Sequence, residues 1–435
     1  MFLALGIFVV TYVLMLAFQA HRPKIALTSA CVFVILGIVG LYDMSPLDAL
    51  KSVDYNVLLM IGGTMGTVTL FIESKMPARL SEVLISKVPN VMWAVTVLSL
   101  FSGVISAFVD NVATVLMVAP IGLAISKKLK ISPVPVLISI AVSSNLQGAA
   151  TLVGDTTSIL LGGFANMNFM NFFWMHGKPG IFWGVELGAL ASILVLLVLF
   201  RKDKQPISAQ VETQVTDYFP TWLMLGTVLL LICASFLPQP SGGAALTLYN
   251  LRSGLICLAL CVVGVVRACM TRKDNTMLKK VLEDLDKDTL LLLFGLFIII
   301  EGITQAGVID AVAALFHKIA GGNPFLLYTL LVFFSVLFSA FIDNIPYVAT
   351  MLPVVQGIAA MMGVEPYVFY FGLLTGATLG GNLTPIGASA NITAIGILRK
   401  NGCTVTTKDF LRIGIPFTMS AVLVGYAFIW LFWGI

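Results

Sequence analysis

Long apolar stretches and short polar connections alternate along almost the whole chain. Many of these stretches have roughly 20 residues, the helical length that crosses the hydrocarbon core of a bilayer. Runs such as ILVLLVLF at 193–200 do not alternate as the strands of an outer-membrane barrel do. The pattern predicts an all-α polytopic membrane protein with about ten full spans, at 2–18, 25–42, 56–73, 133–165, 181–200, 222–238, 251–266, 289–306, 367–398 and 414–433.

Two further apolar segments, 91–126 and 325–361, differ from these spans because each contains two stretches and returns to its starting side. The first stretch, 2–18, has no basic residue in front of it, and a second apolar stretch follows after HRPK. We therefore interpret it as a retained span and not as a cleaved signal peptide.

Composition agrees with a membrane protein, because 59% of the 435 residues are hydrophobic, 11% are charged and the mean hydropathy is +1.01. With these spans, 21 of the 25 Lys and Arg residues fall on one side. That side is predicted to be cytoplasmic, which puts both termini outside a plasma (inner) membrane. No Lys or Arg is left for the membrane interior. The net charge of +4 comes from this excess of basic residues on one side of the membrane, so it does not indicate a nucleic-acid partner.

A repeat with one fixed offset divides the chain into halves. The segments FSGVISAFVDNVATVLMVAP at 101–120 and FSVLFSAFIDNIPYVATMLP at 334–353 share nine identical positions when position 101 is aligned with position 334. GAATLVGDTTSI at 148–159 meets GNLTPIGASANI at 381–392 at the same offset, with no gap introduced. The spacing predicts repeats at 1–200 and 222–435, joined by a cytoplasmic linker at 201–221. An odd number of crossings per unit inserts the second copy upside down, as in many secondary transporters.

Three carboxylates, Asp110, Asp155 and Asp343, lie well inside these apolar repeats. An ionised carboxylate at mid-bilayer is costly, so each is expected to be protonated, bound to a cation or facing water. This is the chemistry of a sodium or proton carrier. A purely structural role as helix caps is the alternative for the Asp110-Asn111 and Asp343-Asn344 pairs, since both residue types are preferred caps.

The second repeated window resembles a helix interrupted within the membrane, at 133–165 and at 367–398. Glycines cluster there with hydroxyl and amide side chains, which predicts unwound backbone with carbonyls free to bind a cation. The candidate cation-binding residues are Asp110, Asn111, Gly154, Asp155, Asp343, Asn344 and Gly387. The candidate substrate-binding residues are Thr151, Thr156, Thr157, Ser158, Asn382, Thr384, Ser389 and Asn391.

A hairpin with an Asp-Asn tip, followed by a TLVGD or TPIGASAN break, occurs twice and resembles the ion transporter superfamily. That group includes arsenite permeases, NhaD-type sodium/proton antiporters, the P protein and divalent anion/sodium symporters. The resemblance implies that 91–126 and 325–361 are re-entrant hairpins, that the protein is a homodimer and that transport is an elevator movement. The symporters carry Ser-Asn-Thr at the tips where this chain has Asp110-Asn111-Val112 and Asp343-Asn344-Ile345, which argues against a di- or tricarboxylate substrate.

The leading functional hypothesis is a secondary transporter of a small anion or oxyacid, coupled to Na⁺ or H⁺. The alternative is a sodium/proton antiporter with no anionic substrate. A channel would show flux that solute does not saturate, and an enzyme would need a nucleophile or metal set. The six cysteines form no CxxC pair and have no matching histidine cluster. No enzyme activity, cofactor or metal beyond Na⁺ is therefore expected.

Overall fold

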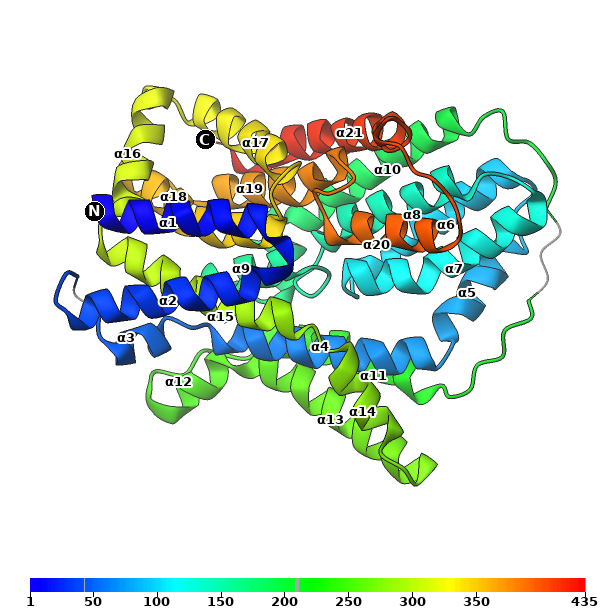
Figure 1. Cartoon of the computed structure of the whole chain (residues 1–435), viewed down its shortest axis with the longest axis horizontal. Coiled ribbons are helices and arrows are strands. Elements are labelled where there is room, and N and C mark those ends of the chain that lie inside the picture. Colours follow the sequence, from blue (N-terminus) through cyan, green and yellow to red (C-terminus); the bar gives the residue numbers. More distant parts are fainter. Residues whose placement is uncertain (43, 208–210, 435) are drawn as a thin grey trace.

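The computed structural model describes residues 1–42, 44–207 and 211–434, and almost all regular structure in them is helical (Figure 1). The first half contains α1 (Phe2–Ala17), η1 (Gln19–His21), α2 (Arg22–Ile38), α3 (Pro46–Lys51), α4 (Tyr55–Glu73), α5 (Met76–Ile85), α6 (Val91–Ser106), α7 (Asn111–Leu129), α8 (Pro133–Gly148), α9 (Thr156–Phe164), η2 (Phe169–Phe172), β1 (Trp174–Met175), β2 (Lys178–Pro179) and α10 (Ile181–Leu199). The second half contains α11 (Phe219–Ser235), α12 (Gly243–Asn250), α13 (Arg252–Arg272), α14 (Thr276–Asp284), α15 (Lys287–Gln305), α16 (Val308–Ala320), α17 (Pro324–Ser339), α18 (Asn344–Met362), α19 (Tyr367–Gly380), η3 (Gly381–Leu383), α20 (Ser389–Lys400) and α21 (Thr407–Trp433).

Eight described helices are long and apolar enough to cross a membrane, or nine if the bent pair α16–α17 is one span. Six of them match predicted spans, and the other two are the hairpin arms α7 and α18. Four predicted spans differ from a single long helix. Those at 2–18 and 222–238 are the shorter helices α1 and α11, and those at 133–165 and 367–398 are interrupted. The all-α membrane fold is confirmed, and the eight or nine described helices that meet these criteria compare with about ten predicted spans, two of which were expected to be interrupted.

Helix starts repeat at the offset found in the sequence. The helices α6, α7 and α9 begin at 91, 111 and 156. The helices α17, α18 and α20 begin at 324, 344 and 389, which are the equivalent positions at that offset. Their starts coincide because Asn or Asp caps the arms in both copies: Asn90 and Asn323 before the first arm, Asp110 and Asp343 before the second. The duplication is thus visible in the helices, whereas the domain boundaries and the inverted orientation remain predictions.

Helices of the first half pack against helices of the second half. Helix α4 lies against α13, α2 lies against α15, and α10 lies against α21, so each half supplies one partner of every pair. Figure 1 shows the α6–α7 hairpin at one end of the molecule and the α17–α18 hairpin at the other, with both termini at the α17–α18 end. This exchange of partners brings the ends of both hairpins into one central region.

The linker lies along the surface of the first half. Residues 208–210 of the predicted linker lie outside the described residues. On either side of them, the backbone N–H of Met92 donates to the carbonyl of Asp203, and Thr213 donates to the carboxylate of Glu82. The polar segment 267–288 contains α14, which buries Met277 and Val281 and leaves most of its other side chains exposed.

Candidate functional site

The two Asp-Asn pairs lie at the tips of the hairpins, where one arm ends and the next begins. Asp110 caps α7 by accepting hydrogen bonds from the backbone N–H groups of Val112 (3.0 Å) and Ala113 (3.2 Å). Asp343 caps α18 by accepting one from Ile345 (3.1 Å). The capping role that the sequence leaves open is therefore real. Each of these caps uses one carboxylate oxygen; the other oxygen of Asp343 accepts from Arg22, and that of Asp110 is left for a further partner.

Both predicted helix breaks are present, and each contacts its own hairpin tip in the same way. Between α8 and α9, the Thr151 hydroxyl donates to the carbonyl of Ala107, and between α19 and α20 Thr384 donates to Ala340. Gly154 and Gly387 both lie in non-helical backbone. These contacts hold unwound backbone against the end of the first arm in each repeat.

The glycines of the breaks are required by close approach of carbonyl oxygens. A Cβ at Gly154 would lie 2.7 Å from the carbonyl oxygen of Ser106 and 2.8 Å from that of Ala107. A Cβ at Gly387 would lie 2.9 Å from the carbonyl oxygens of both Ser339 and Ala340. Such carbonyls are the kind of oxygen ligand that unwound helices offer to cations in membranes.

Asp155 is the centre of the site, with only 4% of its surface exposed. Its carboxylate accepts hydrogen bonds from the Thr157 hydroxyl (2.7 Å) and from the backbone N–H of Thr156 (2.8 Å) at the start of α9. The side-chain amides of Asn111 and Asn344 approach it at 3.5 and 3.4 Å. Residues from both hairpins thus meet at the one carboxylate that has no counterpart in the other repeat, where Ala388 stands.

Asn145 of α8 connects this centre to the second helix break, and it is not among the site residues predicted from the sequence. Its side-chain oxygen accepts from Asn111 (2.8 Å), and its amide nitrogen donates to Asn382 (2.9 Å) and Asn391 (3.1 Å). All four asparagines are almost fully buried. A polar residue within an otherwise apolar span is the signal that would have found it.

Several predicted substrate residues bond to protein groups within this network. Ser158 donates to the carbonyl of Gly148, Asn382 donates to that of Val142, and Asn391 donates to those of Gly381 and Thr384. Thr157 also pairs with Thr378 of α19. Of the eight predicted substrate residues, Thr156 and Ser389 line the cavity described next, whereas Thr151, Thr157, Ser158, Asn382, Thr384 and Asn391 do not.

A cavity of about 360 Å³ leads from the site toward α14. It lies between α4 and α7 and is lined near Asp155 by Asn111, Thr156, Asn344 and Ser389. Its acidic lining residues are Glu73, Asp110, Asp155, Asp284 and Asp286, and its one basic lining residue is Lys280. Lys280 is 2.5 Å from the Glu73 carboxylate, and this hydrogen bond raises the pKa of Lys280. The cavity therefore has an excess of negative charge.

Arg22 corrects the prediction that no basic residue reaches the interior site. Its Nη1 lies 2.8 Å from the Asp343 carboxylate. The α1–α2 turn that carries it lies near the middle of the long axis in Figure 1. The spans predicted at 2–18 and 25–42 instead place residues 19–24 at the aqueous edge, because basic residues that flank an apolar stretch are expected there.

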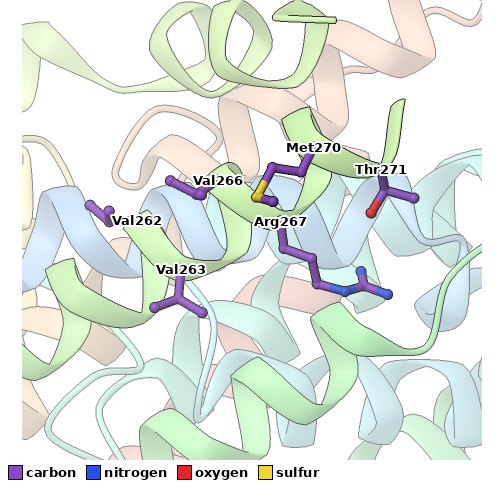
Figure 2. A pocket seen from close by; sticks show the side chains of 6 residues that line it. All are labelled: Val262, Val263, Val266, Arg267, Met270 and Thr271. Carbon is purple, nitrogen blue, oxygen red and sulfur yellow. The ribbon is translucent and has the colours of Figure 1, made fainter. Parts of the chain in front are cut away.

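Another hollow, of about 530 Å³, lies on the outer side of α13 and has a different lining. Figure 2 shows Val262, Val263, Val266 and Met270 of that helix beside Arg267. Arg267 pairs with Asp217 (2.5 Å). Apolar side chains that are half exposed or more suit contact with lipid, so this hollow is not a candidate ion site.

Comparisons with known proteins agree with a transporter. A model of the CitMHS family, described as citrate transporter, matches residues 12–376 and again 255–434. The uncharacterized transporter Rv2685 of Mycobacterium tuberculosis is 30% identical over 436 residues, which cover 99% of this chain and 98% of that protein. The P protein of Mus musculus is 24% identical, with 98% of this chain aligned to 59% of its own length.

Solved structures with the same fold are also transporters. YdaH of Alcanivorax borkumensis matches with a TM-score of 0.64 at 13% identity, covering 94% of this chain and 98% of that chain. MtrF of Neisseria gonorrhoeae, assigned to a class of antimetabolite efflux pumps, matches with a TM-score of 0.59 at 13% identity, covering 91% and 83%. These comparisons confirm the predicted superfamily resemblance, and the family and the relatives are membrane transporters, not enzymes.

Proposed function

Since this chain belongs to the citrate transporter family, we propose that it is an ion-coupled secondary transporter of a small anion or oxyacid, with Na⁺ or H⁺ as the coupling ion. The observation that carries the proposal is the buried Asp155 carboxylate at the end of an acidic cavity, approached by asparagines from both hairpins. A cation at Asp155 and Asp110 would neutralise charge that is otherwise costly to hold away from water.

The order of binding follows from the charge of the cavity. Five carboxylates line it against one lysine, and that lysine is paired with Glu73. An anion that enters before a cation meets net repulsion, whereas an anion that follows a bound cation meets less negative charge. We therefore propose that the cation binds first and that Thr156, Ser389 and the amides of Asn111 and Asn344 then contact the anion.

The acidic lining also favours the second candidate function, a sodium/proton antiporter with no anionic substrate. The family description names citrate, which is a tricarboxylate. The residues at the two hairpin tips of this chain argue against such a substrate. Flux measurements decide between the two functions. Purified protein in proteoliposomes would be tested with Na⁺, H⁺, arsenite, sulfate, dicarboxylates and citrate under imposed gradients. Saturable anion flux that depends on Na⁺ or H⁺ supports the leading proposal, whereas Na⁺/H⁺ exchange without any anion supports the antiporter.

Alternating access is proposed as an elevator movement of the hairpins and broken helices against α2, α4, α13 and α15. In the present conformation the cavity separates α7 from α4, while the second hairpin is held on its other side by Tyr12, whose hydroxyl donates to the carbonyl of Pro346 (2.6 Å). The cavity extends to Lys280 and Asp284 in the segment predicted to be cytoplasmic. We therefore propose that this conformation is open to the cytoplasm and that the homodimer expected from the superfamily holds the scaffold helices still.

A further inference from the structure

The two hairpin tips are equivalent in sequence, yet their surroundings differ in charge. Asp343 forms an ion pair with Arg22, and the side chains are 14% and 16% exposed respectively. Asp110 lines the acidic cavity and forms no ion pair among residues 1–42, 44–207 and 211–434. One tip carboxylate is thus already neutralised by the protein, and the other faces the cavity.

Arg22 is fixed in place by contacts on both sides of its guanidinium. Its Nε donates to the carbonyl of Met15 at the end of α1 (3.3 Å), while its Nη1 binds Asp343. The Tyr12 hydroxyl, one turn earlier on α1, donates to the carbonyl of Pro346 (2.6 Å) and to Thr350 (3.0 Å) on α18. The α1–α2 turn is therefore docked on the second hairpin by several bonds and not by one mobile side chain.

The second repeat supplies no such cation to the first tip. The second repeat also has an arginine at the start of a helix, Arg252 of α13, but its guanidinium donates to the carbonyl of Tyr249 (2.6 Å) and does not line the cavity. Lys280, the basic residue that lines the cavity, is 2.5 Å from Glu73. The difference between the tips therefore arises because a basic side chain pairs with the tip carboxylate of the second hairpin but not with that of the first, among the described residues.

Arginine stays protonated at all physiological pH values, so it neutralises Asp343 for as long as the α1–α2 turn stays docked on the second hairpin. A Na⁺ or a proton that binds Asp343 must displace the guanidinium and leave it without a partner in a largely buried place, which is unfavourable. Asp110 and Asp155 are held only by neutral donors, which leaves their charge for an external cation.

We infer that Arg22 is a built-in counter-ion that takes the place of a second coupling cation, so that the protein in this conformation binds one coupling cation, at Asp110 and Asp155. This inference rests on the proposed function, because it assigns the number of ions that the same site uses. The second hairpin then contributes Asn344 and its backbone to the shared centre but no cation site of its own.

Cation binding to the purified full-length protein tests the inference without any substrate. Thermal unfolding in detergent is followed while NaCl replaces choline chloride at constant ionic strength, and in choline alone while the pH is stepped. The slope of stabilisation against the logarithm of cation concentration counts the bound cations. Wild type is expected to show a slope of about one cation, and Arg22→Gln a slope of about two, because Asp343 then needs a partner.

Matched variants separate charge from shape. Arg22→Lys keeps the charge and should keep the slope of wild type, and the double variant Arg22→Gln/Asp343→Asn removes both charges and should return it to about one. If Arg22→Gln alone does not fold, the slope of the double variant is compared with that of wild type instead. A slope of about two in wild type that Arg22→Gln leaves unchanged overturns the inference, as does loss of cation binding in the double variant.

Flux measurements in proteoliposomes distinguish failure of this inference from failure of the proposed function. Single-cation binding by wild type together with no saturable flux of any solute rejects the proposed function and leaves the role of Arg22 intact. Coupled flux by wild type together with two bound cations in the unfolding measurement supports transport and rejects the role of Arg22.

Discussion

Asn111 and Asn344, which occupy equivalent positions in the two repeats, direct their side-chain amides at different oxygens of the same carboxylate, that of Asp155. The two hairpins therefore share one acidic centre. Because Asp155 belongs to the first repeat alone, the centre is asymmetric even though the helices around it are duplicated. Loss of this carboxylate should have larger consequences than loss of the Asp343 carboxylate at the second hairpin tip.

Replacing Asp155 by Asn should abolish coupling of flux to Na⁺ or H⁺, because the amide cannot carry the charge that a cation neutralises. Asp110→Asn should do the same, since Asp110 lines the cavity beside it. Asp343→Asn should retain coupling and lose stability, because Arg22 is left without its partner. Flux against pH and Na⁺ for the three variants checks this. Coupling lost in Asp343→Asn and kept in the other two would move the cation site to the second repeat and contradict the assignment.

Alanine at Gly154 or Gly387 should disrupt the helix breaks, because the added Cβ would approach three carbonyl oxygens at 2.6 to 2.9 Å. The expected loss in unfolding free energy is about 1 to 3 kcal/mol, with cation binding weakened as well. Gly396→Ala is the matched control, since no atom lies within 4 Å of its added Cβ. Thermal unfolding in detergent with and without NaCl measures both effects. Equal behaviour of all three variants would contradict the role of the close carbonyls.

Removing the Tyr12 hydroxyl should destabilise the present conformation, because its bonds to Pro346 and Thr350 hold α1 against α18. On the proposed cycle these bonds break when the second hairpin moves. A loss of about 1 kcal/mol would lower the population of this conformation about fivefold. The rate at which an impermeant thiol reagent labels Leu116→Cys in the cavity, in a background without native cysteines, should fall correspondingly.

The control for that experiment is Tyr55→Phe, whose hydroxyl donates to Leu50 at an exposed position. It should leave the labelling rate of Leu116→Cys unchanged. Faster labelling in Tyr12→Phe than in the parent would show that the hydroxyl stabilises the opposite conformation.

Lys280→Gln should increase the affinity for a cation that enters the site through the cavity. The substitution leaves the Glu73 carboxylate unpaired and makes the lining one charge more negative. Because both groups are partly exposed to water, the effect is modest, about a twofold lower Na⁺ concentration for half-maximal flux at low salt. Lys279→Gln, in the exposed pair with Glu283 on the same helix, is the control. A weaker apparent Na⁺ affinity in Lys280→Gln would contradict the electrostatic account.

The sequence by itself predicts the helices, the fixed offset between the repeats, the hairpin tips and the two breaks, because these features depend on local chemistry. Apolar length predicts most of the spans, Asp and Asn at positions 110, 111, 343 and 344 predict helix starts, and clustered glycines predict unwound backbone. The same local rules failed where helices are shorter than a full span, because packing against other helices, and not apolar length, decides where a helix ends in a membrane.

Only the tertiary structure decided which of these residues act together. Asn145 looks like one of several polar residues near the end of an apolar span, yet it joins the first hairpin tip to the second break because α8 packs against η3 and α20. Arg22 looks like a residue at the aqueous edge, yet it pairs with Asp343, 321 positions away in the chain. Most of the predicted substrate hydroxyls and amides turned out to bond to backbone. Partnership between distant side chains is set by how helices of both repeats cross, and no local pattern along the chain carries that information.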